Sequence, residues 1–186
     1  MEAVKKFEIN KITKIVLVAL VGSLLLTISA KLKIPFYPVP MTMQTFVVLF
    51  LGITLGSKIG LLTVSLYLIE GIFGLPVFAN TPEKGIGLIY FTGPTMGYLL
   101  GFLIAVYVAG SFNYEKGLIS KFLKLVFSVS FIYLLGIIWL GILIGWDKPL
   151  FKLGAQPFLL AELFKVLLLI VASQILIKIK KLIKIT

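Results

Sequence analysis

The sequence predicts an all-α integral membrane protein: a single membrane domain over residues 1–186, with six transmembrane helices and both termini in the cytoplasm. Three observations lead to this prediction. The 186-residue chain is 60% hydrophobic, with a mean hydropathy of +1.13, whereas soluble domains are about half apolar. Its apolar residues form runs close to the ~20 residues that cross a bilayer as a helix. Its charged residues, mostly lysines, gather at the ends of those runs.

Six apolar runs define the expected helices. The first follows the charged segment MEAVKKFEINKITK and has no clear small-residue cleavage site, so we expect a retained helix and not a signal peptide. The second and third runs are separated only by Gly56-Ser57-Lys58, so they form a tight hairpin, or one of them is tilted or partly re-entrant. The expected spans are about 12–30, 41–56, 58–73, 93–111, 119–144 and 157–178.

The lysines predict the orientation. With six spans, both termini share one side with two of the loops, and that side carries twelve lysines: Lys5, Lys6, Lys11, Lys14, Lys58, Lys116, Lys121, Lys124, Lys178, Lys180, Lys181 and Lys184. The opposite loops carry five: Lys31, Lys33, Lys84, Lys148 and Lys152. Cytoplasmic loops are enriched in lysine, where it also contacts anionic membrane lipid. We therefore attribute the net charge of +11 to membrane topology, and expect no nucleic-acid partner.

The loops expected on the outer side, about 31–40, 74–92 and 145–156, are the more elaborate ones, so we expect the functional site there. Three prolines stiffen the first of them. Glutamine and threonine at the start of the second span need polar partners in an apolar setting. We expect ligand contacts, or else interfacial aromatics and partners within the bundle, at Phe36, Tyr37, Gln44 and Thr45.

The second outer loop offers Asn80. Its amide both donates and accepts, which suits a polar heterocycle, although an Asx-turn at Asn80-Thr81-Pro82 is the alternative. The fourth span is expected to begin at Gly93, with Pro94 as its first helical residue. Small residues then recur every fourth position and favour close helix packing over a ligand site: Gly93, Gly97, Gly101, Ala105 and Ala109.

Glu162 and Lys165 form the third feature of the outer side. They are three residues apart near the start of the sixth span, so they share one helix face. A charge at the membrane centre costs at least ~2.5–3.5 kcal/mol, which something must offset. The two side chains pair with each other, or Lys165 reaches towards the surface, or both flank a polar cavity in which Lys165 meets a carboxylate.

The absence of Cys and His excludes disulfides, thiol chemistry, zinc-finger-type sites and His-based catalysis. We expect no metal site. No glycine-rich ATP-binding loop of the Walker A type is present either, so any ATP hydrolysis would belong to a partner.

Four stretches together resemble the BioY family, the biotin-binding S-components of energy-coupling-factor (ECF) transporters: PFYPVPMTMQTFVVLFLG, LYLIEGIFGLPVFAN, GPTMGYLLGF and PFLLAELFKVLL. The resemblance covers about residues 12–178. It implies a six-helix bundle of the ECF S-component type, with a site for biotin near the outer surface. It also implies a transmembrane coupling protein and two cytoplasmic ATPases as partners, and no cofactor.

The resemblance also implies roles for single residues. Asn80 matches the polar position after the P-V-F-A block, Lys165 matches the lysine of helix six, and Glu162 stands where an aspartate is expected. Because the chain has no arginine, Lys165 is the expected cation for the biotin carboxylate. In such families small residues of helix one contact the coupling protein; here they are Ala19, Ser23 and Thr27.

Biotin has a carboxylate, a ureido group and an apolar body, and a cation, an acid, an amide and aromatic walls complement it. The expected function is therefore capture of biotin for uptake, without enzyme activity. The alternatives are a membrane enzyme for lipid or prenyl substrates, which usually has acid- or His-rich cytoplasmic motifs, and a structural assembly subunit.

Overall fold

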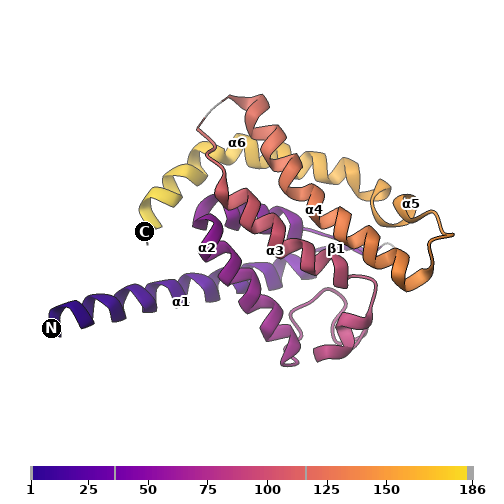
Figure 1. Ribbon diagram of the computed structural model, residues 1–186, viewed down its shortest axis with the longest axis horizontal. Coiled ribbons are helices and arrows are strands. Elements are labelled where there is room, and N and C mark those ends of the chain that lie inside the picture. The colour runs from indigo at the N-terminus through magenta and orange to yellow at the C-terminus, as the bar shows by residue number, and fades with distance from the viewer. Residues whose placement is uncertain (1, 36, 116, 184–186) are drawn as a thin grey trace.

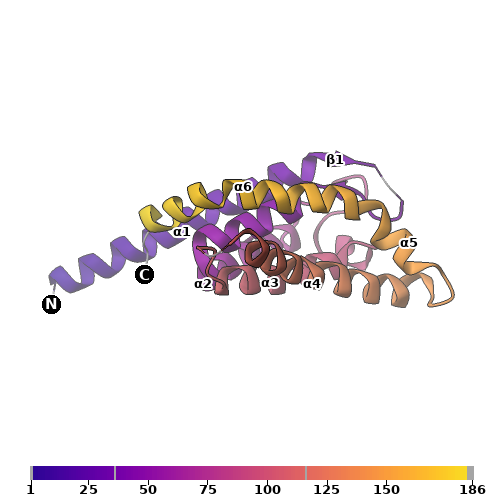
Figure 2. The ribbon, with the colours of Figure 1, turned by 90° about the horizontal axis from the view of Figure 1, so that it is seen from above.

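The computed structural model describes residues 2–35, 37–115 and 117–183 as a helical bundle. Its elements are α1 (Glu2–Lys31), β1 (Lys33–Ile34), β2 (Met41–Thr42), α2 (Gln44–Ile72), the 3-10 helix η1 (Gly87–Thr92), α3 (Met96–Ser111), α4 (Leu118–Ile144), α5 (Leu150–Gly154), the 3-10 helix η2 (Gln156–Phe158) and α6 (Leu159–Ile183). The start of α1 and the end of α6 lie on the same side of the molecule (Figures 1 and 2).

Helix α2 is a hairpin of two helical arms. At Gly56 the backbone is non-helical, with φ 78° and ψ 177°, a conformation that glycine adopts without a Cβ clash. The amide of Gln44 donates to the hydroxyl of Tyr67 over 2.8 Å, whereas 23 residues of straight helix would span about 34 Å. Of the alternatives left open by the sequence, the tight hairpin is the one that forms.

Several helices are long and apolar enough to cross a membrane: Lys11–Lys31, Gln44–Ile72, Leu118–Ile144 and Leu150–Leu182, together with the shorter apolar helix Met96–Ser111. Because α2 folds back on itself, the described chain passes through the bundle six times. The prediction of a helical bundle with apolar helices long enough to span a membrane is thus confirmed.

The predicted start of the fourth span was wrong. Gly93 is extended, with φ −83° and ψ 175°, and α3 begins only at Met96, after Thr95 as N-cap. Pro94 therefore lies before the helix, because residues 87–92 form η1 and the chain must turn before it enters α3.

A short hairpin formed by residues 33–42 was not predicted. Strands β1 and β2 pair antiparallel, with Lys33 opposite Thr42 and Ile34 opposite Met41. The proline-rich loop lies between them, and since proline cannot donate to a strand ladder, the pairing is confined to two residues on each side.

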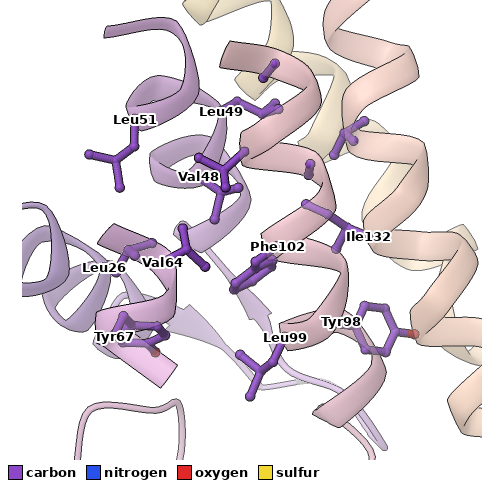
Figure 3. Packing of buried hydrophobic residues seen from close by; sticks show 14 of the residues in the cluster. Leu26, Val48, Leu49, Leu51, Val64, Tyr67, Tyr98, Leu99, Phe102 and Ile132 are labelled. Carbon is purple, nitrogen blue, oxygen red and sulfur yellow. The ribbon is translucent and has the colours of Figure 1, made fainter. Parts of the chain in front are cut away.

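Small residues let α3 approach its neighbours closely. A Cβ added at Gly101 would lie 2.6 Å from the Cα of Ile132 on α4, and one added at Gly52 on α2 would lie 2.9 Å from the carbonyl of Val106 on α3. Ala105 and Ala109 are fully buried. The core residues from α2, α3 and α4, with Leu26 of α1, gather around this packing (Figure 3).

Candidate functional site

A cavity lies where the β1–β2 hairpin, the loop after α2 and the first turns of α6 meet the start of α3 and the middle of α4. About 550 Å³ is free of protein atoms there, mouth included. Its walls are mainly apolar and include five aromatic side chains: Tyr90, Tyr98, Phe102, Tyr133 and Phe158. One side is polar and contains Thr42, Gln44, Thr45, Thr95 and Lys165. This lining, apolar with a few polar groups, suits a small, largely apolar molecule with a polar group.

Lys165 is the charged group of the cavity wall. It is 8% exposed, and its ammonium donates to the carbonyl of Thr42 at 2.8 Å and to the hydroxyl of Thr45 at 2.9 Å. The carboxylate of Glu162 lies 3.4 Å away. Pairing of the two charges, one of the alternatives that the sequence left open, is therefore present, but the ammonium makes its shorter bonds to neutral oxygens.

Glu162 lies beside this cavity and is 5% exposed. Its Oε2 accepts from the hydroxyls of Thr45 and Tyr133, each at 2.9 Å, as well as from Lys165. Its Oε1 is buried and has no hydrogen-bond partner among the described residues. Glu162 also lines an apolar hollow between α4 and α6, and Tyr133 borders both spaces.

Gln44 ties the two arms of α2 to the following loop. Its amide donates to the hydroxyl of Tyr67 at 2.8 Å, and Tyr67 donates to the carbonyl of Val77 at 3.1 Å. The hydroxyl of Thr42 donates to the amide oxygen of Gln44 at 3.2 Å. Gln44 thus both lines the cavity and positions its walls.

The loop after α2 is packed through Phe78, which is 1% exposed. The ring of Phe78 stacks on Tyr90, with centroids 4.7 Å apart, and meets the edges of Tyr67 and Phe91. Gly71 makes room, since a Cβ there would overlap the Phe78 ring. The hydroxyl of Tyr90 donates to the carbonyl of Ala79 at 2.7 Å, which fixes the loop over the cavity.

Asn80 stands at the turn of this loop. It has a φ of 60°, in the left-handed region that asparagine tolerates better than most residues. Its amide oxygen accepts from Lys33, and neighbouring Lys31 donates to the carbonyl of Phe78 at 2.9 Å. Asn80 itself is not among the residues that line the cavity, whereas Ala79 is.

The two aromatic residues expected as ligand contacts have different outcomes. Phe36 lies outside the described residues. Tyr37 is 89% exposed and does not line the cavity. Sequence reasoning named none of the five aromatic residues that line the cavity, but Tyr98 and Tyr133 carried a readable signal. Their signal was a phenolic hydroxyl inside an apolar span, which must find a partner away from water.

The small-residue face of α1 is turned towards α2. Ala19 is 2% exposed and Ser23 is 1% exposed. The hydroxyl of Ser23 donates to Glu70, and that of Thr27 donates to the carbonyl of Ser23 at 3.1 Å. Ala19 and Ser23 are buried within the chain and Thr27 is half-buried; a contact of this face with a coupling protein stays a prediction.

No group of three or more metal-ligating side chains occurs in the part of the chain that the structure describes. The site instead combines a buried cation, a buried carboxylate, hydroxyls and aromatic walls. That set can bind an apolar molecule with an anionic end, since in a dry pocket a charge-assisted hydrogen bond contributes ~1.5–3 kcal/mol.

Comparisons with known proteins agree with the resemblance found in the sequence. The profile of the BioY family matches residues 2–184. A relative from Pyrococcus horikoshii, called a probable biotin transporter BioY, is 36% identical over 155 residues, which are 83% of this chain and 90% of the relative. The biotin transporter BioY of Thermotoga maritima is 37% identical over 159 residues, 85% and 90% of the two chains.

A solved structure has the same fold. The crystal structure of the S-component for biotin from an ECF-type ABC transporter aligns with a TM-score of 0.75, covering 92% of this chain and 93% of that one, at 24% sequence identity. This likeness concerns the arrangement of the helices.

Proposed function

Since the chain belongs to the BioY family, we propose that it is the biotin-binding subunit of a vitamin uptake system in the cell membrane. It captures biotin at the outer face and delivers it together with an ATP-driven energy-coupling module, made of a transmembrane coupling protein and two cytoplasmic ATPases. The names of the relatives support the ligand, and the shared fold with the S-component of an ECF-type transporter supports the type of uptake system.

The observation that carries the proposal is the position of Lys165. Its ammonium is buried at the edge of an aromatic cavity, and its shortest bonds are to uncharged oxygens. A carboxylate arriving in the cavity would replace one of these with a bond between two opposite charges. The aromatic walls would hold the apolar bicycle and tail of biotin.

At the ureido end we propose Glu162 as the acceptor for an N–H group. Oε2 already accepts from three donors, so the oxygen left for a ligand is Oε1, which is buried. Glu162 lies beside the cavity and is not among its lining residues, so this contact requires the side chains around Oε1 to move aside. Gln44, Thr45 and Asn80 complete the proposed polar contacts. For Asn80 this requires its amide to turn from Lys33 towards the cavity.

Lys165→Met tests the site, because methionine keeps the unbranched apolar stem and removes the charge. We expect biotin to bind at least about ten-fold more weakly, the equivalent of ~1.4 kcal/mol. The wild type should prefer biotin to its uncharged amide, and Lys165→Met should lose most of that preference. Calorimetry or labelled-biotin binding in detergent measures both. Equal binding of both ligands by the two proteins would overturn the assignment of Lys165.

The lysine distribution supports an orientation with both termini in the cytoplasm. Because the chain has no cysteine, single cysteines can be introduced without a background. We expect an impermeant thiol reagent to label Lys84→Cys from outside the cell and Glu115→Cys only after the membrane is opened. Labelling of both cysteines from outside would contradict the proposed orientation.

A further inference from the structure

The side-chain amide of Gln44 is held at both ends. Its nitrogen donates to the hydroxyl of Tyr67 at 2.8 Å, and its oxygen accepts from the hydroxyl of Thr42 at 3.2 Å. The Thr42 oxygen also accepts from the backbone N–H of Gln44 at 3.3 Å. Thr42 and Gln44 line the cavity, whereas Tyr67 is not among its lining residues. The nitrogen end of the amide is therefore turned away from the cavity, and the oxygen end lies on the side of Thr42.

The hydroxyl of Tyr67 sets this orientation. It has one proton, which it donates to the carbonyl of Val77 at 3.1 Å, so towards Gln44 it can only accept. With the amide of Gln44 turned over, its oxygen and the Val77 carbonyl would compete for that one proton. Because Tyr67 is fully buried, one acceptor would then lose its partner away from water, which costs more than a hydrogen bond contributes.

Contacts that do not need its hydroxyl hold the ring of Tyr67. It meets the ring of Phe78 edge-on, with centroids 5.2 Å apart, and Phe78 stacks on Tyr90. The loop that carries Phe78 is also fixed by Lys31, which donates to the Phe78 carbonyl at 2.9 Å. Removal of the hydroxyl alone should therefore free the amide of Gln44 and leave the loop in place.

We propose that Tyr67 is a positioning residue that makes Gln44 a hydrogen-bond acceptor for one N–H group of the ligand. A carbonyl oxygen has two lone pairs, and Thr42 uses one of them. A site with a fixed acceptor favours an N–H there and rejects an analogue that lacks it. The inference rests on the proposed function, because it takes this N–H from the ureido group of biotin, whose other N–H faces Glu162. Tyr67 acts through Gln44 and does not touch the ligand.

Two analogues of biotin test this, each a cyclic carbamate with oxygen in place of one ureido N–H. The measured quantity is the ratio of the dissociation constants of analogue and biotin. Gln44→Leu identifies the analogue whose missing N–H faces Gln44, because its ratio falls in that variant. Tyr67→Phe should lower the same ratio by about three- to ten-fold, as for one hydrogen bond, since the freed amide can turn an N–H to the new oxygen. The ratio of the other analogue should stay unchanged.

Tyr114→Phe is the matched control. Tyr114 is 3% exposed, and its hydroxyl also donates to a backbone carbonyl, that of Ala109 at 3.0 Å. It is not among the residues that line the cavity, so this variant should leave both ratios unchanged. In a Gln44→Leu background, Tyr67→Phe should change neither ratio by more than about two-fold. This comparison separates action through Gln44 from a shift of the loop.

Variants of Gln44 test the same orientation if Tyr67→Phe does not yield folded protein. Gln44→Glu keeps an acceptor and has no N–H to offer, so it should still discriminate against the analogue, whereas Gln44→Leu should not. If Gln44→Glu loses the discrimination as fully as Gln44→Leu, Gln44 serves the ligand as a donor and the inference is wrong.

Three further results would overturn the inference alone: a wild type that binds biotin and both analogues equally well, a Tyr67→Phe variant that keeps the wild-type ratios, or an effect of Tyr67→Phe equally large in the Gln44→Leu background. A wild type that binds no biotin would instead refute the proposed function, and the inference with it. The wild-type measurement therefore distinguishes the two failures.

Discussion

The two sides of α4 are packed in different ways. Towards α3, the seam is close: a Cβ at Gly97 would overlap the backbone carbonyl of Leu135, and one at Gly101 would lie 2.6 Å from Ile132. Towards α6, the helices leave a hollow with about 800 Å³ free of protein atoms, its open side included. Two polar bridges cross this second seam, Tyr133 to Glu162 at 2.9 Å and Lys121 to Ser173 at 2.8 Å.

This difference separates a contact held by close packing from one held by polar bridges. Helices in lipid associate through close van der Waals packing and interhelical hydrogen bonds. The α3–α4 seam uses the first and the α4–α6 seam depends more on the second. Of the polar groups of the proposed site, Glu162 borders the loosely packed seam, whereas Thr45 and Lys165 meet where α2 packs on α6. The ligand chemistry therefore lies next to the part of the bundle in which side chains have most room to adjust.

The largest effect is expected where the close seam is broken. Gly101→Leu would force a side chain into the backbone of α4, and overpacking of a dense core costs ~1–3 kcal/mol or more. Because backbone atoms cannot move aside as a side chain can, we expect no folded protein in detergent. Size-exclusion chromatography with fluorescence detection measures this.

The control for Gly101→Leu is Gly117→Ala, since a Cβ at Gly117 meets nothing within 4 Å among the described atoms. It should elute like the wild type. A folded Gly101→Leu protein of wild-type stability would mean that α3 and α4 are not held at the distance seen here.

Sequence reasoning identified the helical bundle because long apolar runs and flanking lysines are local signals. It placed Lys165 and Glu162 on one face because their spacing determines this. It missed Tyr133, since the partner of a hydroxyl on α4 depends on which helix packs beside it. The partner contact of Ala19, Ser23 and Thr27 stays a prediction, because small residues allow close approach of any helix and Ser23 also bonds to Glu70 of α2.

The next effect concerns the second polar bridge of the loose seam. Lys121 is 5% exposed and donates to Ser173, itself 2% exposed. Ser173→Ala would leave a buried ammonium without this acceptor, a loss of about 1–3 kcal/mol or more. Lys121→Met removes the charge as well, and replacing a buried charge by an apolar group of similar volume is often neutral or stabilising.

Thermal unfolding in detergent measures this second prediction. Ser173→Ala should melt at a lower temperature than the wild type, Lys121→Met should not, and the double variant should behave like Lys121→Met. If Lys121→Met melts at as low a temperature as Ser173→Ala, then the bonds of the ammonium stabilise the protein by more than removal of the buried charge returns. The comparison of the two seams would then need revision.

The smallest effect is expected from adding one methylene to the loose seam. Val126 lines the hollow between α4 and α6 and is 39% exposed. Val106 of α3 is instead fully buried where α3 crosses α2. A Cβ added at Gly60 of α2 would lie 2.8 Å from the Val106 side chain. Val126→Leu has room, and its gain is limited to new dispersion contacts, because lipid is as apolar as the hollow. We expect a change below about 1 kcal/mol, towards higher stability, against a loss of ~1–3 kcal/mol for Val106→Leu. Melting temperatures of the two variants in the same detergent compare the seams directly. Equal losses at both positions would show that the hollow is closed in the membrane protein, and that both seams are equally dense.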